Sequence, residues 1–278
     1  MLGQRIITAV VLLAILLPAL FAQQPAWFMA VTLVLITLAC WEWGRLNGYH
    51  GKLAWLTALE GLGFCAVMWK LGWPSMKLPL LWLFAGTAWI ALGIWLIARG
   101  VGAWQRIPAW WRVSVGLLLL SLAWLAVVQA RLMGINFLLS MLVTVWVADI
   151  GAYFAGRRFG KKKLAHAISP GKSWEGVYGG MAAVLVLAVV WAQWTPSFAD
   201  SLSLYQKLLR GQGWLLVILG AMLMVAMSVV GDLVESLVKR SSGVKDSSGL
   251  LPGHGGVLDR VDALLPTLPL GMMLYSLA

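Results

Sequence analysis

Carboxylates and basic residues gather in three short segments in the second half of the chain. Seven of the ten acidic residues lie in these segments, whereas the first 148 residues contain only two. A carboxylate in so apolar a chain is costly, and it usually faces a wet cavity, a partner or a cation. The clustering therefore predicts a site.

The segment from Asp232 to Asp262 is the densest of the three. Four of its residues recur at helical spacing and share one face of a helix: Asp232, Glu235, Ser236 and Lys239. The glycine-rich turn around His254 offers backbone amides to an anion. His254 has little packing reason to be there; the alternative is a neutral turn histidine, and zinc is not expected without companion ligands.

The other two segments are shorter. Asp149 falls in the last two turns of an expected membrane helix and precedes a basic, glycine-bearing exit. Asp149 has two possible roles. It binds a substrate or a metal, or it forms an ion pair with a neighbouring lysine or arginine that holds helices together. Ser169-Pro170 predicts the start of a helix, whose amides beside Lys172 suit a phosphate. The alternative there is a basic interfacial turn anchored by Trp174.

This mixture of residues suits phosphoryl or nucleotidyl transfer. Such chemistry needs hard oxygen ligands for Mg²⁺, and cations with backbone amides for phosphate oxygens. Asp232 and Asp259 are the best candidates for metal ligands, since each is expected at a junction of helix and loop.

The elements that position these residues are expected to be membrane helices. The chain has 278 residues, of which 61% are hydrophobic and 11% charged. Soluble domains have about 45–50% apolar and about 25% charged residues. An all-α polytopic fold with about nine spans is predicted, at 4–22, 27–43, 53–71, 78–98, 113–130, 135–154, 176–194, 214–231 and 261–278. The net charge of +11 is assigned to topology and to anionic lipids, so no nucleic-acid partner is expected.

The distribution of basic residues predicts the orientation. With nine spans and a cytoplasmic N-terminus, sixteen of the 21 lysine and arginine residues fall on the cytoplasmic side. That excess agrees with the positive-inside rule. The polar segments then face the cytoplasm, where nucleotides are available.

The third segment resembles a known signature. Ser236-Leu-Val-Lys239-Arg240-(four residues)-Lys245-Asp246-Ser-Ser-Gly-Leu-Leu-Pro252-Gly-His254-Gly255-Gly256-Val-Leu-Asp259-Arg260-Val-Asp262 is similar, over 27 contiguous residues, to that of the phosphatidate cytidylyltransferases, or CDP-diacylglycerol synthases. The Ser169–Gly176 and Asp149 segments also resemble that family, in the expected order. Before residue 140 the chain matches only as an array of membrane helices.

The resemblance implies the reaction of CTP with phosphatidate to give CDP-diacylglycerol and diphosphate, for phospholipid synthesis. It implies a divalent metal such as Mg²⁺, a monovalent cation such as K⁺, and a homodimer. We expect a multi-pass protein of the bacterial inner membrane, with residues 1–134 as scaffold and dimerisation region and 135–278 as catalytic region. The active site is expected to face the cytoplasm.

Residue roles follow from the matched positions. The metal is assigned to Asp232 and Asp259. The catalytic residues are expected to be Asp232, Asp259, Lys239, Arg240 and Asp246. The residues expected to bind substrate are Ser169, Lys172, Ser236, Lys245, His254, Gly255, Gly256, Arg260, Asp262 and Asp149.

Two other functions are compatible with parts of the sequence. A transporter would also carry intramembrane carboxylates, but it predicts acids spread over several helices and an inverted repeat. Another membrane transferase that uses CDP-linked lipids is a nearer alternative. The Asp-Gly-x-x-Ala-Arg signature of CDP-alcohol phosphotransferases is absent from the sequence, which disfavours it.

Overall fold

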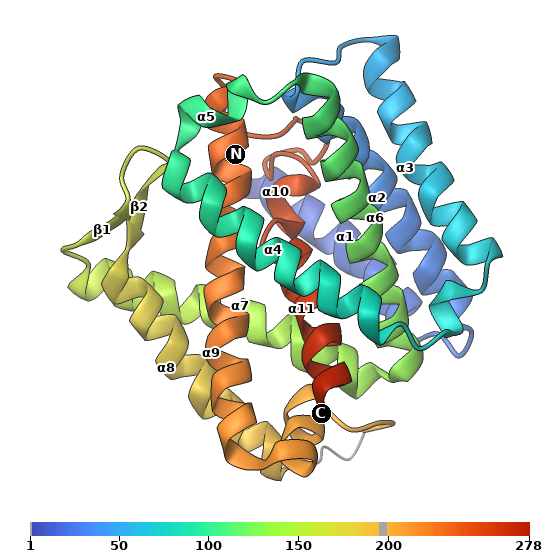
Figure 1. Ribbon diagram of the computed structural model, residues 1–278, viewed down its shortest axis with the longest axis vertical. Coiled ribbons are helices and arrows are strands. Elements are labelled where there is room, and N and C mark those ends of the chain that lie inside the picture. The colour runs from blue at the N-terminus through green and yellow to red at the C-terminus, as the bar shows by residue number, and fades with distance from the viewer. Residues whose placement is uncertain (1, 195–198) are drawn as a thin grey trace.

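The structure, a computed structural model, describes residues 2–194 and 199–278. Helices dominate it (Figure 1). In chain order they are α1 (Leu2–Phe21), α2 (Pro25–Leu46), α3 (Lys52–Lys70), the 3₁₀ turn η1 (Trp73–Ser75), α4 (Pro79–Arg99), α5 (Val101–Arg106), α6 (Ala109–Met133), α7 (Ile135–Phe159), α8 (Trp174–Gln193), α9 (Leu204–Ser241), α10 (Leu258–Val261) and α11 (Leu264–Leu277). The two strands are β1 (Lys163–Ala165) and β2 (Ser169–Ser173).

The helices confirm an all-helical polytopic membrane protein. In the part of the chain that the structure describes, seven are long and apolar enough to cross a membrane: α1, α2, α4, α6, α7, α8 and α9. Large apolar side chains such as Leu80 and Phe84 are exposed on them, as expected for a surface that faces lipid. Helices also form over the other two expected spans. However, α11 has only 14 residues, too few for a bilayer, and α3 is less apolar than the seven.

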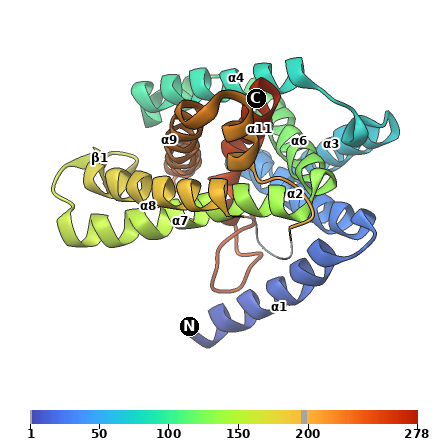
Figure 2. The ribbon, with the colours of Figure 1, turned by 90° about the horizontal axis from the view of Figure 1, so that it is seen from below.

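The long helix α9 organises the second half of the molecule. It begins at a capping box, in which Ser203 and Gln206 bond to each other's backbone amides. Gly213 interrupts it with a positive φ of 75°, so α9 consists of a short helix and a longer one that continues to Ser241. In both views it lies against α8 and crosses α7 (Figures 1 and 2).

Helices α7 and α8 lie side by side because small residues face each other between them (Figures 1 and 2). A Cβ on Gly179 would lie 2.2 Å from that of Ala155, and one on Gly180 would lie 2.8 Å from the carbonyl oxygen of Ala148. Small residues allow this close approach in membrane helix pairs. The pairing fixes Asp149 on α7 relative to the hairpin that precedes α8.

The expected helix start at Ser169-Pro170 is wrong. These residues begin β2, which pairs antiparallel with β1 and protrudes beyond the ends of α7 and α8 (Figure 1). The helix begins at Trp174, and the Ser173 hydroxyl caps it by accepting a hydrogen bond from the Gly176 amide at 3.2 Å. A residue that precedes proline disfavours the helical conformation, which agrees with an extended Ser169.

Candidate active site

One face of α9 carries the polar residues that the helical spacing predicts. Lys239 forms ion pairs with Glu235, one turn earlier, and with Asp259, whose Oδ1 lies 2.6 Å from the ammonium nitrogen. Glu235 is buried, and neither of its oxygens accepts a hydrogen bond of ordinary geometry. Lys239 therefore links the end of α9 to the segment that carries Asp259.

Asp259 sits in a cradle of donors formed by the loop between α9 and α10. Its Oδ2 accepts hydrogen bonds from the Ser247 amide and hydroxyl, each at 2.9 Å, and from the Gly256 amide at 2.7 Å. Burial alone would raise the pKa of Asp259, but the Lys239 ammonium and the two amides outweigh it and hold this pKa at about 2. Asp259 is therefore a fixed anion.

The cradle requires glycine at position 255. Gly255 has a φ of +79°, and a Cβ there would lie 2.5 Å from Oδ2 of Asp259. Only glycine combines this conformation with so close an approach. The glycine-rich turn thus serves to bring the backbone close to a carboxylate of the chain itself.

Asp232 lies in a different cavity. Its Oδ2 forms an ion pair with the Lys172 ammonium at 2.7 Å, and its Oδ1 accepts a hydrogen bond of 3.3 Å from Ser236. Asp149 lines the same cavity of about 430 Å³, which α7, α8, α9 and β2 enclose. Lys172 thus reaches this cavity from the strand, one residue before the helix cap.

A second cavity, of about 610 Å³, lies beyond the α9–α10 loop. It is lined by residues of that loop, by one residue of α10 and by the start of α1: Gln4, Arg5, Lys245, Asp246, Ser248, Gly249, Leu251, Gly253, His254, Gly255 and Arg260. Seen from below, the loop descends towards the N-terminal end of α1 (Figure 2). Thr8 on α1 donates a hydrogen bond of 2.8 Å to the Pro252 carbonyl, which ties this helix to the loop. Nδ1 of His254 is buried without a partner.

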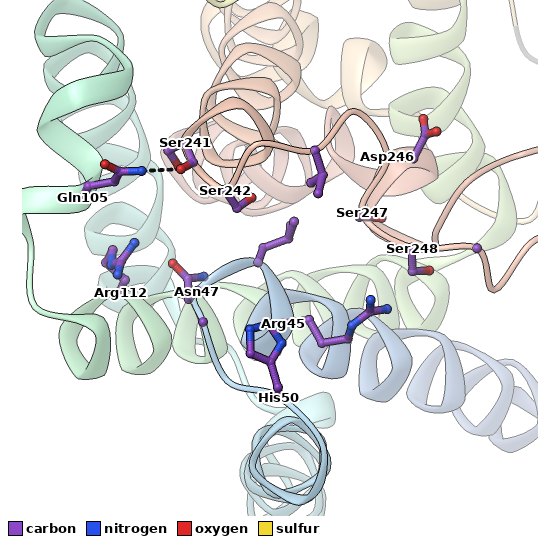
Figure 3. Close-up of a pocket in the computed structure, with 14 residues that line it drawn as sticks. Arg45, Asn47, His50, Gln105, Arg112, Ser241, Ser242, Asp246, Ser247 and Ser248 are labelled. Atoms are coloured by element: carbon purple, nitrogen blue, oxygen red, sulfur yellow. Dashed lines mark hydrogen bonds between the residues drawn. The ribbon is translucent and has the colours of Figure 1, made fainter.

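A third cavity, also of about 610 Å³, lies on the opposite side of the same loop. It is bounded by the end of α2, by α5 and α6, and by the loop residues Asp246, Ser247 and Ser248 (Figure 3). Three loop residues, Asp246, Ser248 and Gly249, line both this cavity and the second one. That part of the loop is therefore a thin wall between two open spaces.

Two of the expected site residues lie apart from these groups, and a third, Asp262, adjoins Asp232. Ser169 pairs with Ala165 at the far end of β2 and does not line the cavity that contains Lys172. Arg240 is exposed and contacts the Val244 carbonyl at 3.4 Å. Asp262 accepts a hydrogen bond from the Ala263 amide, and it is close enough to Asp232 for electrostatic interaction.

Sequence reasoning missed Glu42, on α2. Its side chain is 0% exposed. It accepts four hydrogen bonds from the α9–α10 loop and the start of α10, donated by the Ser247 and Ser248 hydroxyls and by the Val257 and Leu258 amides. The available signal was a lone acid in an otherwise apolar span, since a carboxylate at that depth needs partners.

A divalent cation at this site would have to keep most of its water ligands. In residues 2–194 and 199–278, no three His, Cys, Asp or Glu side chains converge as a metal-binding group. Mg²⁺ usually retains several waters and is held by one or two carboxylates, so a larger group is not required. Asp232 and Asp259 each already contact a lysine ammonium, which shows that each is placed to neutralise positive charge.

Comparison with known proteins gives relatives along nearly the whole chain. A phosphatidate cytidylyltransferase of Pseudomonas aeruginosa is 41% identical over 275 residues, which cover 97% of this chain and 95% of that protein. One of Haemophilus influenzae is 35% identical over 294 aligned residues, 99% of each chain. One of Brucella suis is 39% identical over 183 residues, 66% of this chain and 60% of that protein.

The family assignment extends over the same length. Residues 3–278 match the model of the Cytidylyltransferase family, so the match includes the N-terminal helices as well as the segment from Asp232 to Asp262. The resemblance seen in the 236–262 signature is thereby confirmed. The chain is a member of the cytidylyltransferase family.

Proposed function

We propose that this chain transfers the cytidylyl group of CTP to phosphatidate, giving CDP-diacylglycerol and diphosphate. The observation that carries the proposal is the pair of carboxylates, Asp232 and Asp259, each held by a lysine. Asp232 lines the cavity that contains Lys172, and Asp259 lies against Gly255, which lines the cavity that contains Lys245 and Arg260. The relatives from Pseudomonas aeruginosa and Haemophilus influenzae are phosphatidate cytidylyltransferases that this chain covers over 95% and 99% of their lengths, which supports the same reaction.

The two cavities suit the two substrates. The cavity that contains Lys172, Asp149 and Asp232 is enclosed by three membrane-spanning helices, so a lipid phosphate can reach it from the bilayer. The cavity that contains Lys245 and Arg260 is built from a loop and a helix start, and it suits the phosphates of a soluble nucleotide. Lys239 and Asp259 lie next to that loop.

The reaction is an in-line displacement at the α-phosphorus of CTP. A phosphatidate oxygen forms the new bond to that phosphorus, and the bond to the β-phosphate oxygen breaks and releases diphosphate. A phosphate monoester is already largely anionic at neutral pH, so no strong general base is needed. Lys172 orients the lipid phosphate, and Lys245 and Arg260 hold the nucleotide phosphates.

Asp232 and Asp259 are the residues that would hold Mg²⁺, which when bound supplies neutralising charge for the α-phosphoryl group and the leaving diphosphate. A monovalent cation such as K⁺ is part of the same proposal. Lys239 keeps Asp259 beside α9, the helix that also carries Asp232.

The setting of the reaction is also part of the proposal. We place the N-terminus and both polar loops in the cytoplasm of a bacterial cell, at its inner membrane, because of the excess of basic residues on that side. The chain is proposed to work as a homodimer through helices of residues 1–134. Cysteine-accessibility labelling from each side of inverted vesicles tests the orientation, and cross-linking in the native membrane tests the dimer.

The reaction is tested with the purified full chain in lipid nanodiscs and CTP labelled at the α-phosphate. Labelled lipid that forms only when phosphatidate is present supports the proposal, and diphosphate should be released in equal amount. Consumption of CDP-diacylglycerol with an added alcohol would favour the CDP-lipid transferase instead. Ion or substrate flux across sealed vesicles without lipid product would favour a transporter.

A further inference from the structure

Glu42 stands out because it belongs to the half of the chain that carries few charges. It lies one turn before the end of α2, more than 200 residues away in sequence from the loop that it contacts. In the described part of the chain no basic side chain forms an ion pair with it. A buried carboxylate without a counter-ion must be stabilised by hydrogen bonds, and all of those that Glu42 accepts come from one region.

The donors to Glu42 and the donors to Asp259 are neighbours in the sequence of the loop. The Gly256 amide binds Asp259 at 2.7 Å, whereas the next two amides, of Val257 and Leu258, bind Glu42 at 2.9 and 2.7 Å. The Ser247 hydroxyl lies between the two carboxylates, 2.9 Å from Asp259 and 3.2 Å from Glu42. Two carboxylates from opposite halves of the chain thus clamp the same two stretches of loop.

The loop has little other support at this point. Asp246 and Gly249 are exposed, and with Ser248 they form the wall between the two cavities of about 610 Å³. Figure 3 shows the end of α2 beside this wall, with Arg45 on the side of Ser248 and Asn47 on the side of Ser242. Apolar packing cannot fix a segment that is open on both sides, so its hydrogen bonds must do so.

We propose that Glu42 is a positioning residue for catalysis, which holds the 247–248 and 256–258 stretches together so that Asp259 keeps its place beside Lys239. The inference rests on the proposed function, in which Asp259 serves the transfer. A contact needed only to join α2 to the rest of the fold would not have to meet the Ser247 hydroxyl that Asp259 also uses, whereas Glu42 and Asp259 share it. The first region of the chain then contributes directly to the geometry of the site.

The main test is Glu42→Gln, measured in two ways. The amide keeps one acceptor oxygen, but its NH₂ group faces a backbone amide that can only donate, so that hydrogen bond is lost and the serine hydroxyl on the same side must turn to accept. We expect kcat to fall on the order of 10–100-fold, as for other residues that orient a ligand, with KM for CTP within about threefold of the wild type. Hydrogen–deuterium exchange of the metal-free, substrate-free protein should increase in peptides spanning 246–258 and stay unchanged in α7 and α8.

Glu60→Gln is the matched control. Glu60 is the other acid of the first 148 residues, and it is exposed on α3. It should change neither kcat nor exchange of the 246–258 peptides. Ser248→Ala removes one donor to Glu42, so adding it to Glu42→Gln should cost much less than it costs in the wild type, because both changes remove the same contact.

The outcomes separate the two proposals. Wild-type kcat in Glu42→Gln, or a reduced kcat with unchanged exchange at 246–258, overturns the positioning role. Faster exchange at 246–258 combined with reduced kcat supports it. If the wild-type chain forms no CDP-diacylglycerol at all, the proposed function fails, and the exchange data still decide whether Glu42 anchors the loop. Glu42→Asp, which keeps the charge but withdraws it by one methylene, should behave like Glu42→Gln; wild-type behaviour of this variant also overturns the inference.

Discussion

The two ends of α9 are both polar, but they are built differently. At its start lies a cluster that we call the corner cluster, made of Asn136, Ser140, Thr144, Trp191, Asp200, Ser201, Ser203, Tyr205 and Gln206. At its end lies the charged cluster of Lys172, Asp232, Glu235, Lys239, Asp259 and Asp262. Both clusters combine residues of membrane-spanning helices with residues of the loops that join them.

The clusters differ in whether their buried polar atoms have hydrogen-bond partners. Asp200 is the only charged member of the corner cluster, and no member of it has a buried side-chain atom without a partner in the described part of the chain. Among the described residues in or beside the charged cluster, Glu235 has only its ion pair with Lys239, Nδ1 of His254 is buried without a partner, and open cavities adjoin the cluster. A closed set of partners stabilises a fold, whereas unsatisfied groups beside a cavity indicate a ligand. The comparison predicts that substitutions in the charged cluster lower turnover with little effect on stability. Substitutions in the corner cluster should lower stability with little effect on turnover.

The largest expected effect is from Asp232→Asn in the charged cluster. Turnover should fall on the order of 10³-fold, because a carboxylate that faces developing phosphoryl charge through a cation is lost. The melting temperature in detergent should stay within about 2 °C, since a partly exposed ion pair contributes little to stability. Radiolabelled CTP incorporation and a thermal-shift assay measure the two quantities. Asp200→Asn is the matched control, and near-normal turnover of Asp232→Asn would remove Asp232 from the site.

Gly255→Ala should give the second largest effect. The added methyl group would lie 2.5 Å from Oδ2 of Asp259, at a backbone conformation with φ of +79°. Asp259 must move or the turn must open, so we expect turnover to fall on the order of 10²-fold. Gly249→Ala is the control in the same loop, because a Cβ there meets nothing within 4 Å. If the two alanine variants are equally active, the cradle around Asp259 is not needed for the reaction.

The sequence predicted those parts of the site that depend on local spacing. The shared face of Asp232, Ser236 and Lys239 follows from helical periodicity alone, and the structure confirms that α9 extends through all three. The prediction of a helix start at Ser169-Pro170 was wrong. It rested on the local backbone preference at a proline, whereas pairing with β1 makes this segment a strand.

Contacts between residues far apart in the chain could not be predicted from the sequence. Nothing near Glu42 in the chain indicates that it meets Val257, and nothing near Thr8 indicates Pro252. Such pairs arise only when helices far apart in sequence pack together, so periodicity and spacing contain no signal for them. Local spacing therefore places the chemistry only in the second half of the chain, because it contains no signal for the contact of Glu42 with the α9–α10 loop.

The corner cluster supplies the third prediction, Asp200→Ala. Asp200 accepts hydrogen bonds from the Ile135 and Asn136 amides at 2.7 and 3.0 Å, and so caps α7 from a distant loop. Its loss should cost about 1 kcal/mol of stability, or about 2–4 °C in melting temperature. Turnover should remain within about twofold of the wild type. A large loss of turnover at the same temperature would break the division between the clusters.

The pH dependence of this variant provides a separate check. Burial alone would raise the pKa of Asp200, but the two amides lower it below its ordinary value. A lowered pKa stabilises the fold above the unfolded value of about 3.9 and loses that effect as the pH falls through the folded value. The wild type should therefore lose melting temperature more steeply than Asp200→Ala as the pH falls below about 4. Equal slopes would show that this carboxylate does not titrate differently in the two states.

The smallest expected effect is from Tyr205→Phe. The Tyr205 hydroxyl lies 2.6 Å from Thr144 Oγ1, which itself donates to the Ser140 carbonyl, so Tyr205 is the donor of the pair. Removing this hydroxyl leaves Thr144 with its own donated bond and one unfilled acceptor position. The cost should be about 0.5–1.5 kcal/mol, measurable as a small fall in melting temperature. Because Tyr205 begins the helix that ends in the charged cluster, this variant also tests whether α9 transmits strain: reduced turnover at unchanged stability would mean that the two clusters are coupled and that the corner is part of the machinery.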